Sequence, residues 1–228
     1  MIIPENEILI FRKQITHNDN QISDFEDTLS EEEKLKANNY RTKDLKNDYI
    51  FCRGFLRYLI SNFTGSDSSG IVFSYNKNGK PFIEGSKIKF NLSHSKGFLV
   101  IALCLYDEIG IDVEYKREIP DLIEISGKYF SDNEFCEMKT LTSSEQRDAF
   151  FRCWTRKEAF VKALGEGLQF PLSDFSVSFL KNEQPEVKWI RNNETEISHW
   201  KIFEIPAGNE YISSLAVMSV SKKIVIIN

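Results

Sequence analysis

The sequence lacks three features that assign many proteins to a class: paired cysteines, a long apolar run and an excess of positive charge. Its four cysteines form no C-x-x-C pair, and several lie in apolar stretches, which is typical of reduced thiols: Cys52, Cys104, Cys136 and Cys153. No window approaches the ~18 uninterrupted apolar residues of a membrane span, and no basic segment followed by an apolar run opens the chain. We therefore expect a soluble cytoplasmic protein with no membrane partner.

The charge balance argues against a nucleic-acid-binding protein. The chain has 29 basic and 34 acidic residues and a formal net charge of −5, whereas nucleic-acid-binding domains usually carry a basic excess. No nucleic-acid partner is therefore expected. One segment, residues 34–57, is locally basic, with seven lysines and arginines against Asp44 and Asp48. A solvated helix face and a docking surface for an acidic partner both fit this segment.

Helical and strand-rich segments alternate twice along the chain. Ser30 and Glu33 have the spacing of a capping box, which predicts a helix over 30–39. Apolar residues spaced by three or four predict a second helix over 43–63. Short β-rich stretches are then separated by turn residues at 71–75, 87–91, 98–105 and 109–114. Helical patterns return at 121–129, after Ser131 and over 143–164, and strands at 175–180, 201–205 and 211–220. In the helix over 143–164, Ser143 and Gln146 have the spacing of a capping pair, and Gly165 is expected to end the helix in a left-handed conformation.

This repetition predicts an α+β fold of two similar halves, 1–106 and 107–228. We expect the halves to be related by a pseudo-twofold axis, with the active site in the cleft between them. An apolar content of 41% and 18 phenylalanines supply the core that such halves need. A monomer is expected, because a chain with two halves can build the whole cleft by itself.

Residues 109–114, Ile-Gly-Ile-Asp-Val-Glu, carry two carboxylates on a predicted strand. Because strand side chains alternate, Asp112 and Glu114 should point to one face and Ile111 and Val113 to the other. Crowded carboxylates suit a hard cation such as Mg²⁺, and Mn²⁺ is an alternative because its ligand preferences overlap. A half-exposed strand with a polar outer face fits the same pattern, so the spacing leaves both interpretations open.

A predicted helix supplies a third carboxylate. Glu158 and Lys162 are four residues apart in the segment 143–164, so they share one helix face. A surface salt bridge between them is one interpretation. Because apolar residues occupy more than one side of this helix, the other interpretation places both groups at an interior cleft beside Asp112 and Glu114.

Two short polar motifs lie upstream of these carboxylates. Asn-Leu-Ser-His-Ser at 91–95 lies between two apolar stretches, so Ser93 and His94 are predicted in a turn, where they either bind phosphate oxygens or satisfy the turn backbone. Gly-Lys-Pro at 79–81 predicts a second turn with Lys80 projecting from it. Neither motif is decisive alone.

Glu134 admits two roles. It follows Ser131 with the spacing of a capping box, which accounts for a glutamate here without catalysis. A glutamate at a helix start can also be held by its cap while it faces a substrate, so a catalytic role stays open.

Four motifs together resemble the Sfp-type 4′-phosphopantetheinyl transferases. In chain order they are Gly-Lys-Pro at 79–81, Asn-Leu-Ser-His-Ser at 91–95, Gly-Ile-Asp-Val-Glu at 110–114 and Trp-Thr-Arg-Lys-Glu-Ala-Phe-Val-Lys at 154–162. The resemblance spans most of the chain, and the combination is highly specific. The length fits a single-chain, pseudo-dimeric member of this family.

The resemblance implies a role for individual residues. The metal ligands of the family fall on Asp112, Glu114 and Glu158, and its active-site lysine falls on Lys162. Positions that hold coenzyme A, chiefly its phosphates, fall on Lys80, Ser93 and His94. Glu134 matches a glutamate proposed in the family as general base. Many members carry an arginine at the position of Asp48, so the contact to the 3′-phosphate of coenzyme A is expected from Arg53 or Arg41.

The resemblance also implies the reaction. The chain is expected to transfer the 4′-phosphopantetheine arm of coenzyme A, with Mg²⁺, to a serine of an apo acyl or peptidyl carrier protein and to release adenosine 3′,5′-bisphosphate. Such carriers serve fatty-acid, polyketide or nonribosomal-peptide synthesis. A related module that only binds carriers would be expected to lack a metal ligand or the lysine, and all four residues are present.

Overall fold

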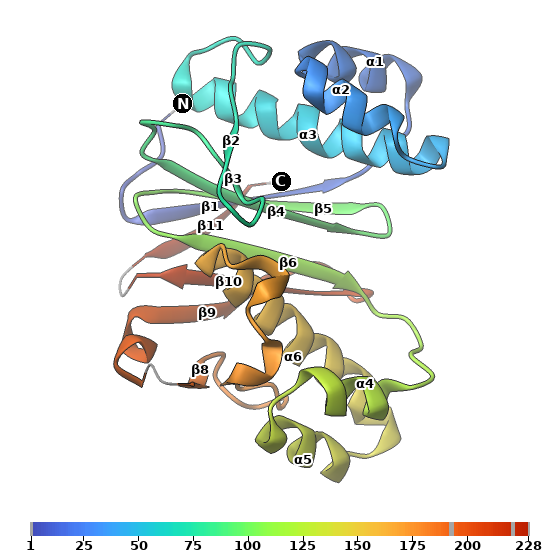
Figure 1. The fold of residues 1–228 in the computed structure, drawn as a ribbon, viewed down its shortest axis with the longest axis vertical. Helices are drawn as coiled ribbons and strands as arrows, with labels where there is room; N and C mark the ends of the chain where they lie inside the picture. The colour runs from blue at the N-terminus through green and yellow to red at the C-terminus, as the bar shows by residue number, and fades with distance from the viewer. Residues whose placement is uncertain (1, 192–193, 220–221, 228) are drawn as a thin grey trace.

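The computed structural model describes residues 2–191, 194–219 and 222–227. Two sheets lie face to face, with the long helix α3 outside one sheet and the long helix α6 outside the other (Figure 1). The predicted α+β fold of two similar halves is confirmed. Among the described residues, no helix combines the length and apolar character that crossing a bilayer requires.

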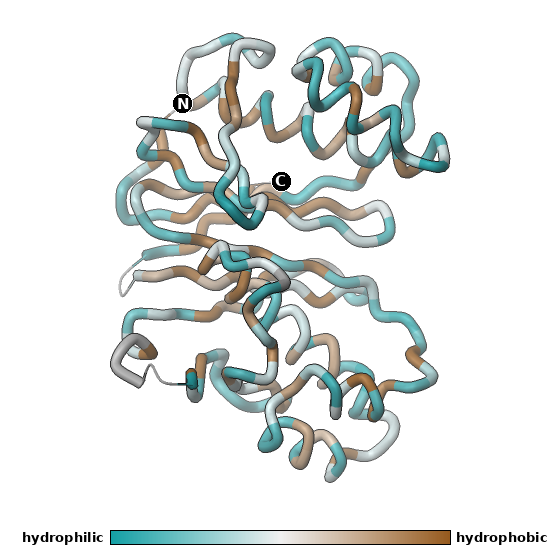
Figure 2. Tube along the Cα trace, in the orientation of Figure 1, coloured by the Kyte–Doolittle hydropathy of each residue, from teal (hydrophilic) through white to brown (hydrophobic). Residues whose placement is uncertain are grey.

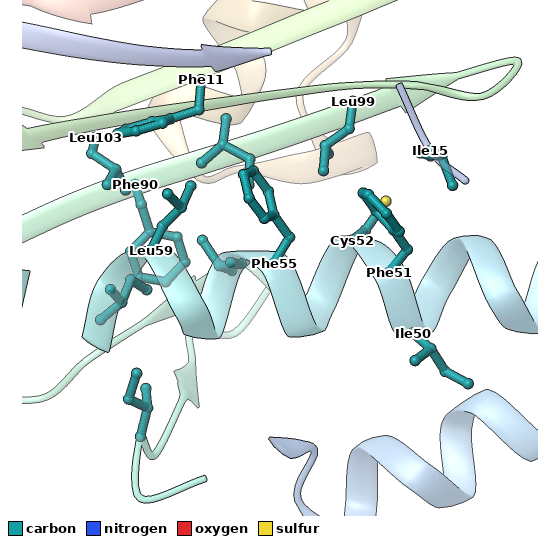
Figure 3. Close-up of a cluster of buried hydrophobic side chains, with 14 of the residues drawn as sticks. Phe11, Ile15, Ile50, Phe51, Cys52, Phe55, Leu59, Phe90, Leu99 and Leu103 are labelled. Carbon is teal, nitrogen blue, oxygen red and sulfur yellow. The ribbon is translucent and has the colours of Figure 1, made fainter. Parts of the chain in front are cut away.

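The first half places three helices over one sheet. Its elements are β1 (Glu7–Gln14), α1 (Asp19–Thr28), α2 (Glu31–Asn38), α3 (Lys43–Thr64), β2 (Ser74–Tyr75), β3 (Pro81–Phe82), β4 (Ile88–Ser95) and β5 (Phe98–Leu105). The capping box predicted at Ser30 and Glu33 is present at the start of α2. The apolar face of α3 packs on the sheet, and Figure 3 shows Phe55 and Leu59 pointing toward Phe11 and Phe90 of the strands.

The second half repeats this plan. Its elements are β6 (Ile109–Tyr115), α4 (Leu122–Tyr129), α5 (Asp132–Thr140), α6 (Ser143–Leu164), the short helices η1 (Gly167–Gln169), η2 (Leu172–Asp174) and η3 (Glu194–His199), and strands β7 (Phe175–Val177), β8 (Val187–Ile190), β9 (Trp200–Glu204), β10 (Tyr211–Met218) and β11 (Lys223–Ile227). Helix α6 has the predicted bounds and ends at Gly165, which adopts the left-handed conformation expected there. Its capping pair is Thr142 and Glu145, one residue before the predicted pair of Ser143 and Gln146.

The sheets do not follow the chain division expected after residue 106. The first sheet has the order β11-β1-β5-β4, and the second has the order β6-β10-β9. Strand β11 pairs in parallel with β1, with Leu9 opposite Val225. The last strand of the second half therefore completes the sheet of the first, and each half depends on the other.

The two sheets meet through an apolar layer. Ile8 and Ile10 of β1 pack with Ile111 and Val113 of β6, and all four side chains are buried. In Figure 2 the hydrophobic residues concentrate along the strands of both sheets. The interface between the halves is therefore mostly apolar, and polar groups gather where the edge strands β4 and β6 lie beside each other.

Candidate active site

The alternation predicted for β6 is confirmed. Ile111 and Val113 lie in the apolar layer between the sheets, whereas Asp112 and Glu114 point to the α6 side. Asp112 is only 4% exposed, which excludes the half-exposed strand with a polar outer face. The structure thus places one buried carboxylate, Asp112, and one partly exposed carboxylate, Glu114, on the side of β6 that faces the long helix.

Gly110 allows β6 to approach α6 closely. A Cβ atom at this position would overlap the backbone of Ala159 and Ala163. Because no larger residue fits this contact, the glycine sets the distance between the strand that carries Asp112 and the helix that carries Lys162.

Lys162 pairs with Asp112 and not with its helix neighbour. Its Nζ lies 2.7 Å from Oδ1 of Asp112 and donates to the Oγ of Ser93 at 3.1 Å. Ser93 in turn donates to the same Asp112 oxygen at 2.8 Å. The surface salt bridge between Glu158 and Lys162 is therefore wrong, and these three groups form one connected cluster.

The Asn-Leu-Ser-His-Ser motif lies along strand β4, and its predicted placement in a turn is wrong. Alternate side chains of this strand face β6: Asn91 accepts from the backbone N–H of Ile111 at 2.9 Å, and Ser95 accepts from that of Tyr115 at 3.1 Å. Ser95 also donates to Glu114 at 2.9 Å. The motif therefore joins the two sheets and positions both carboxylates of β6.

Asp112, Glu114 and Glu158, which together with Lys162 are called the acidic cluster below, carry negative charges that repel one another. Burial raises the pKa of Glu158, and the negative charges of Asp112 and Glu114 raise it further. Burial also raises the pKa of Glu114, with Asp112 again adding to the effect. The Oδ2 atom of Asp112 is buried without a hydrogen-bond partner. A cation beside Asp112 would lower the pKa of both glutamates and would give the Oδ2 of Asp112 a partner.

This donor set fits a hard divalent ion, because every candidate ligand is a carboxylate oxygen. As the side chains stand, no group of three or more His, Cys, Asp or Glu residues in the described part of the chain is arranged to hold a metal. The ammonium of Lys162 lies against Asp112. Binding of Mg²⁺ would therefore require these side chains to turn toward the ion.

Comparison with known proteins decides the family. The profile of the 4′-phosphopantetheinyl transferase superfamily matches residues 108–216, and the profile of the transferase N-terminal region matches residues 16–105. The chain is 27% identical over 216 residues to the 4′-phosphopantetheinyl transferase HetI of Nostoc sp., with 93% of this chain and 88% of that protein covered.

Two further relatives have a higher identity. The 4′-phosphopantetheinyl transferase gsp of Aneurinibacillus migulanus is 30% identical over 83% of this chain and 78% of its own length. The 4′-phosphopantetheinyl transferase Sfp of Bacillus subtilis is 32% identical over 70% of this chain and 70% of its own length. This chain belongs to the 4′-phosphopantetheinyl transferase superfamily. It is an enzyme that transfers phosphopantetheine from coenzyme A to carrier proteins.

The transferase has an open pocket beside the acidic cluster. The pocket has a volume of about 530 Å³ and is lined by Glu158 and Lys162 together with apolar and aromatic side chains, including Trp154, Phe170 and Leu172. Charged and apolar groups thus meet in one cavity, which suits a ligand with a phosphate at one end and a less polar chain at the other.

Lys80 of the transferase is committed to an internal contact. Its Nζ donates to Glu108 at 3.0 Å, to the carbonyl of Ile109 at 3.2 Å and to the carbonyl of Ala163 at 2.9 Å. Burial lowers the pKa of this lysine. The Gly-Lys-Pro turn therefore holds the two halves together, and the structure does not bring the Lys80 amine to the acidic cluster.

The arginines predicted to contact phosphate are also apart from the cluster. Arg53 is buried, lies 2.9 Å from Oε1 of Glu33 and donates to the hydroxyl of Tyr75 at 2.7 Å. Arg41 is exposed in the loop before α3. Only Ser93 among the predicted coenzyme A residues touches the cluster, and His94 follows it on the opposite face of β4.

Glu134 is held by structural partners. Its side chain is 2% exposed, completes the predicted capping box with Ser131, and accepts from the backbone N–H of Val177 at 2.8 Å. Its Oε2 lies 2.7 Å from the Nζ of Lys157, and Cys153 donates to its Oε1. None of these partners belongs to the acidic cluster, so the structure supports the cap and does not bring Glu134 to the chemistry.

The basic segment 34–57 is largely neutralised. Lys34 pairs with Glu31, Lys46 with Glu26 and Lys43 with Asp19. The acidic partners come mostly from α1, which the sequence patterns did not predict as a helix. This segment therefore offers less free positive charge to a partner than its composition indicates.

Three positioning residues were missing from the sequence-based site. Asn91 and Ser95 belong to the recognised motif, and their alternation with Ser93 is the signal that places all three on one strand face. Gly110 opens the Gly-Ile-Asp-Val-Glu motif, but no sequence pattern indicates which helix it approaches.

Proposed function

We propose that this transferase performs its reaction at the cluster of Asp112, Glu114, Glu158 and Lys162, with Mg²⁺ held by the three carboxylates. The observation that carries the proposal is the buried, unpartnered Oδ2 of Asp112 among carboxylates that repel one another. Bound Mg²⁺ would neutralise charge on the pyrophosphate of coenzyme A.

The protein groups orient the donor. Lys162 is the cation nearest to Asp112, and it can move from that carboxylate to a phosphate oxygen when the pyrophosphate enters. Ser93 holds both Asp112 and Lys162, so its hydroxyl keeps the lysine at the mouth of the site. The apolar pocket at Trp154, Phe170 and Leu172 would receive the pantetheine arm.

The transfer itself is a substitution at phosphorus. The carrier serine Oγ forms a bond to the β-phosphorus as the bond from that phosphorus to the bridging oxygen breaks, and adenosine 3′,5′-bisphosphate leaves. The serine proton is released to solvent. Glu134 is not assigned the role of base, because its carboxylate is already bound by a backbone N–H, Lys157 and its own cap.

The acceptor is proposed to be an apo acyl or peptidyl carrier protein, with the chain acting as a monomer. The test is intact mass of several apo carriers after incubation with the protein, coenzyme A and Mg²⁺, with EDTA and Mn²⁺ arms. We expect a gain of one phosphopantetheine that EDTA abolishes and Mg²⁺ restores. Transfer that persists in EDTA would exclude the metal site, and size-exclusion chromatography of the active sample checks the monomer.

A further inference from the structure

Asp48 in the first turns of α3 contacts one histidine, His17, and its charge acts on a second, His94. The Nε2 of His17 lies 2.8 Å from the Oδ1 of Asp48. The backbone N–H of Ile15 donates to the carbonyl of Gly97 in the β4–β5 turn, which brings the segment that carries His17 to this end of the sheet. His94 lies in β4 close to the same turn.

His94 faces the same helix. Phe90 and Leu92 belong to the core packed against α3, and because strand side chains alternate, His94 is the next residue on that face. Burial lowers its pKa, Lys162 lowers it further and Asp48 opposes the shift, so both charges act on the ring. The charges of Lys162 and Asp48 therefore both act on His94, which lies on the face of β4 that is turned toward α3.

This region has an unusual charge for a phosphate site. Arg53 is paired with Glu33, and Lys80 is bound to Glu108 and two carbonyls. The group on α3 that acts on His94 is the carboxylate of Asp48, whose side chain is 20% exposed. A phosphate dianion next to His94 would therefore meet a negative charge.

The inference rests on the proposed function, because the proposed binding mode determines which part of coenzyme A lies near His94 and Asp48. Ser93 of β4 contacts Lys162 but does not line the pocket at Trp154. With the pyrophosphate at Asp112 and Lys162 and the pantetheine arm in that pocket, the nucleotide would leave the cluster toward the end of β4 that carries Ser93 and His94. The adenosine of coenzyme A carries a phosphate at its 3′ position. That phosphate is the charged group that Asp48 would meet.

We propose that Asp48 makes this transferase nearly indifferent to the 3′-phosphate, so that 3′-dephospho-coenzyme A is also a donor. Its repulsion of the 3′-phosphate offsets whatever contacts that group gains. The reaction is otherwise the same: the serine Oγ bonds to the β-phosphorus, the bond to the bridging oxygen breaks, and the proton goes to solvent. With the shorter donor, the product is adenosine 5′-phosphate.

The test measures kcat/KM for coenzyme A and for 3′-dephospho-coenzyme A with one apo carrier, by intact mass of the carrier and chromatography of the released nucleotide. We expect the two donors to differ by less than about tenfold in the wild type. Asp48→Arg should raise the preference for coenzyme A by about tenfold or more, mainly through its KM. Asp48→Asn keeps the shape of the side chain and should shift the preference in the same direction by less.

Asp44→Arg is the matched control, because Asp44 also lies near His17 but its side chain is 83% exposed. We expect it to change the donor preference by less than about twofold, since solvent screens exposed charges. A wild-type preference for coenzyme A above about tenfold, or a preference that neither Asp48 variant alters, would overturn the inference while leaving the transfer activity established. Failure of both donors with every carrier would instead overturn the proposed function, and this inference with it.

Discussion

The two halves of the molecule share an arrangement of helices and a buried ion pair but differ in the other charged residues that these elements carry. Helices α3 and α6 both have 22 residues and both end at a left-handed glycine, Gly65 and Gly165. Each follows a shorter helix with a capping box, and the glutamate of each box is buried against a cation of the long helix: Glu33 against Arg57 and Glu134 against Lys157. Arg57 and Lys157 occupy the same position along their helices.

The difference lies on the other side of those helices. Position 58 of α3 is a tyrosine that is 50% exposed, whereas position 158 of α6 is the carboxylate of Glu158. The strand before the first group of helices, β1, buries Ile8, Leu9, Ile10 and Phe11, whereas β6 carries Asp112 and Glu114. The shared ion pair therefore belongs to the common architecture of the halves, whereas the three carboxylates proposed to hold Mg²⁺ have no counterpart in the first half.

The sharpest test of this division removes the central carboxylate. Asp112→Asn keeps the side-chain shape and should lower the rate of transfer by about 10³-fold, because charge stabilisation at a phosphoryl-transfer site is lost. Carrier mass measured over time gives the rate, and a thermal melt checks folding. Turnover near the wild-type rate in a folded variant would show that the acidic cluster is not the active site.

Matched positions on the long helices give the next test. Glu158→Gln should reduce the rate of transfer by about 10²-fold or more by removing a proposed metal ligand. Tyr58→Phe on α3 should leave the rate unchanged, because this position carries no charge. We would measure both rates across a Mg²⁺ titration. Equal effects of the two variants would contradict the assignment of the chemistry to the second half.

Substitution of the two capping-box glutamates, Glu33 and Glu134, tests whether the two halves share a stabilising ion pair. Glu33→Gln and Glu134→Gln should each lower the free energy of unfolding by about 3 kcal/mol, since each removes the negative charge that pairs with buried cations: Arg53 and Arg57 at Glu33, and Lys157 at Glu134. Urea unfolding measures this loss in both variants.

The transfer rate of the Glu134 variant then distinguishes a role in stability from a role as general base. Loss of a general base costs about 10²–10⁴ in kcat, and we expect folded Glu134→Gln to lose less than about tenfold. A variant with wild-type stability and a loss in the larger range would restore Glu134 as the base and break the parallel with Glu33.

The contact of β6 with α6 gives the smallest expected effect. Gly110→Ala should destabilise the protein by about 1–3 kcal/mol, because the added methyl group has to push the strand away from the backbone of α6. Gly70→Ala is the control, since a Cβ there meets its nearest atom at 3.4 Å. Thermal melts of both variants measure the difference. Equal melting temperatures would mean that the strand and helix can separate freely.

Local patterns account for much of the fold. The bounds of α6, the helix over 43–63 and the alternation of β6 follow from residue spacing, because helix and strand periodicity are properties of the chain itself. Strands β1 and β11 and helix α1 were not predicted. β1 is buried on both faces, so its sequence shows an apolar run and no alternation. β11 is likewise a short run of β-branched residues without alternation, and its pairing with β1 shows that it is a strand.

The sequence by itself determined which carboxylates share a face, since Asp112 and Glu114 are two residues apart in a strand and Glu158 and Lys162 are four apart in a helix. Only the tertiary structure decided which charged groups remain available. Arg53, Lys80 and Glu134 are the residue types that phosphate binding or base catalysis requires, but each is held by partners 20 or more residues away, such as Glu33, Ala163 and Lys157. A buried charge must find a partner, and the folded chain, not the local pattern, determines which partner is within reach.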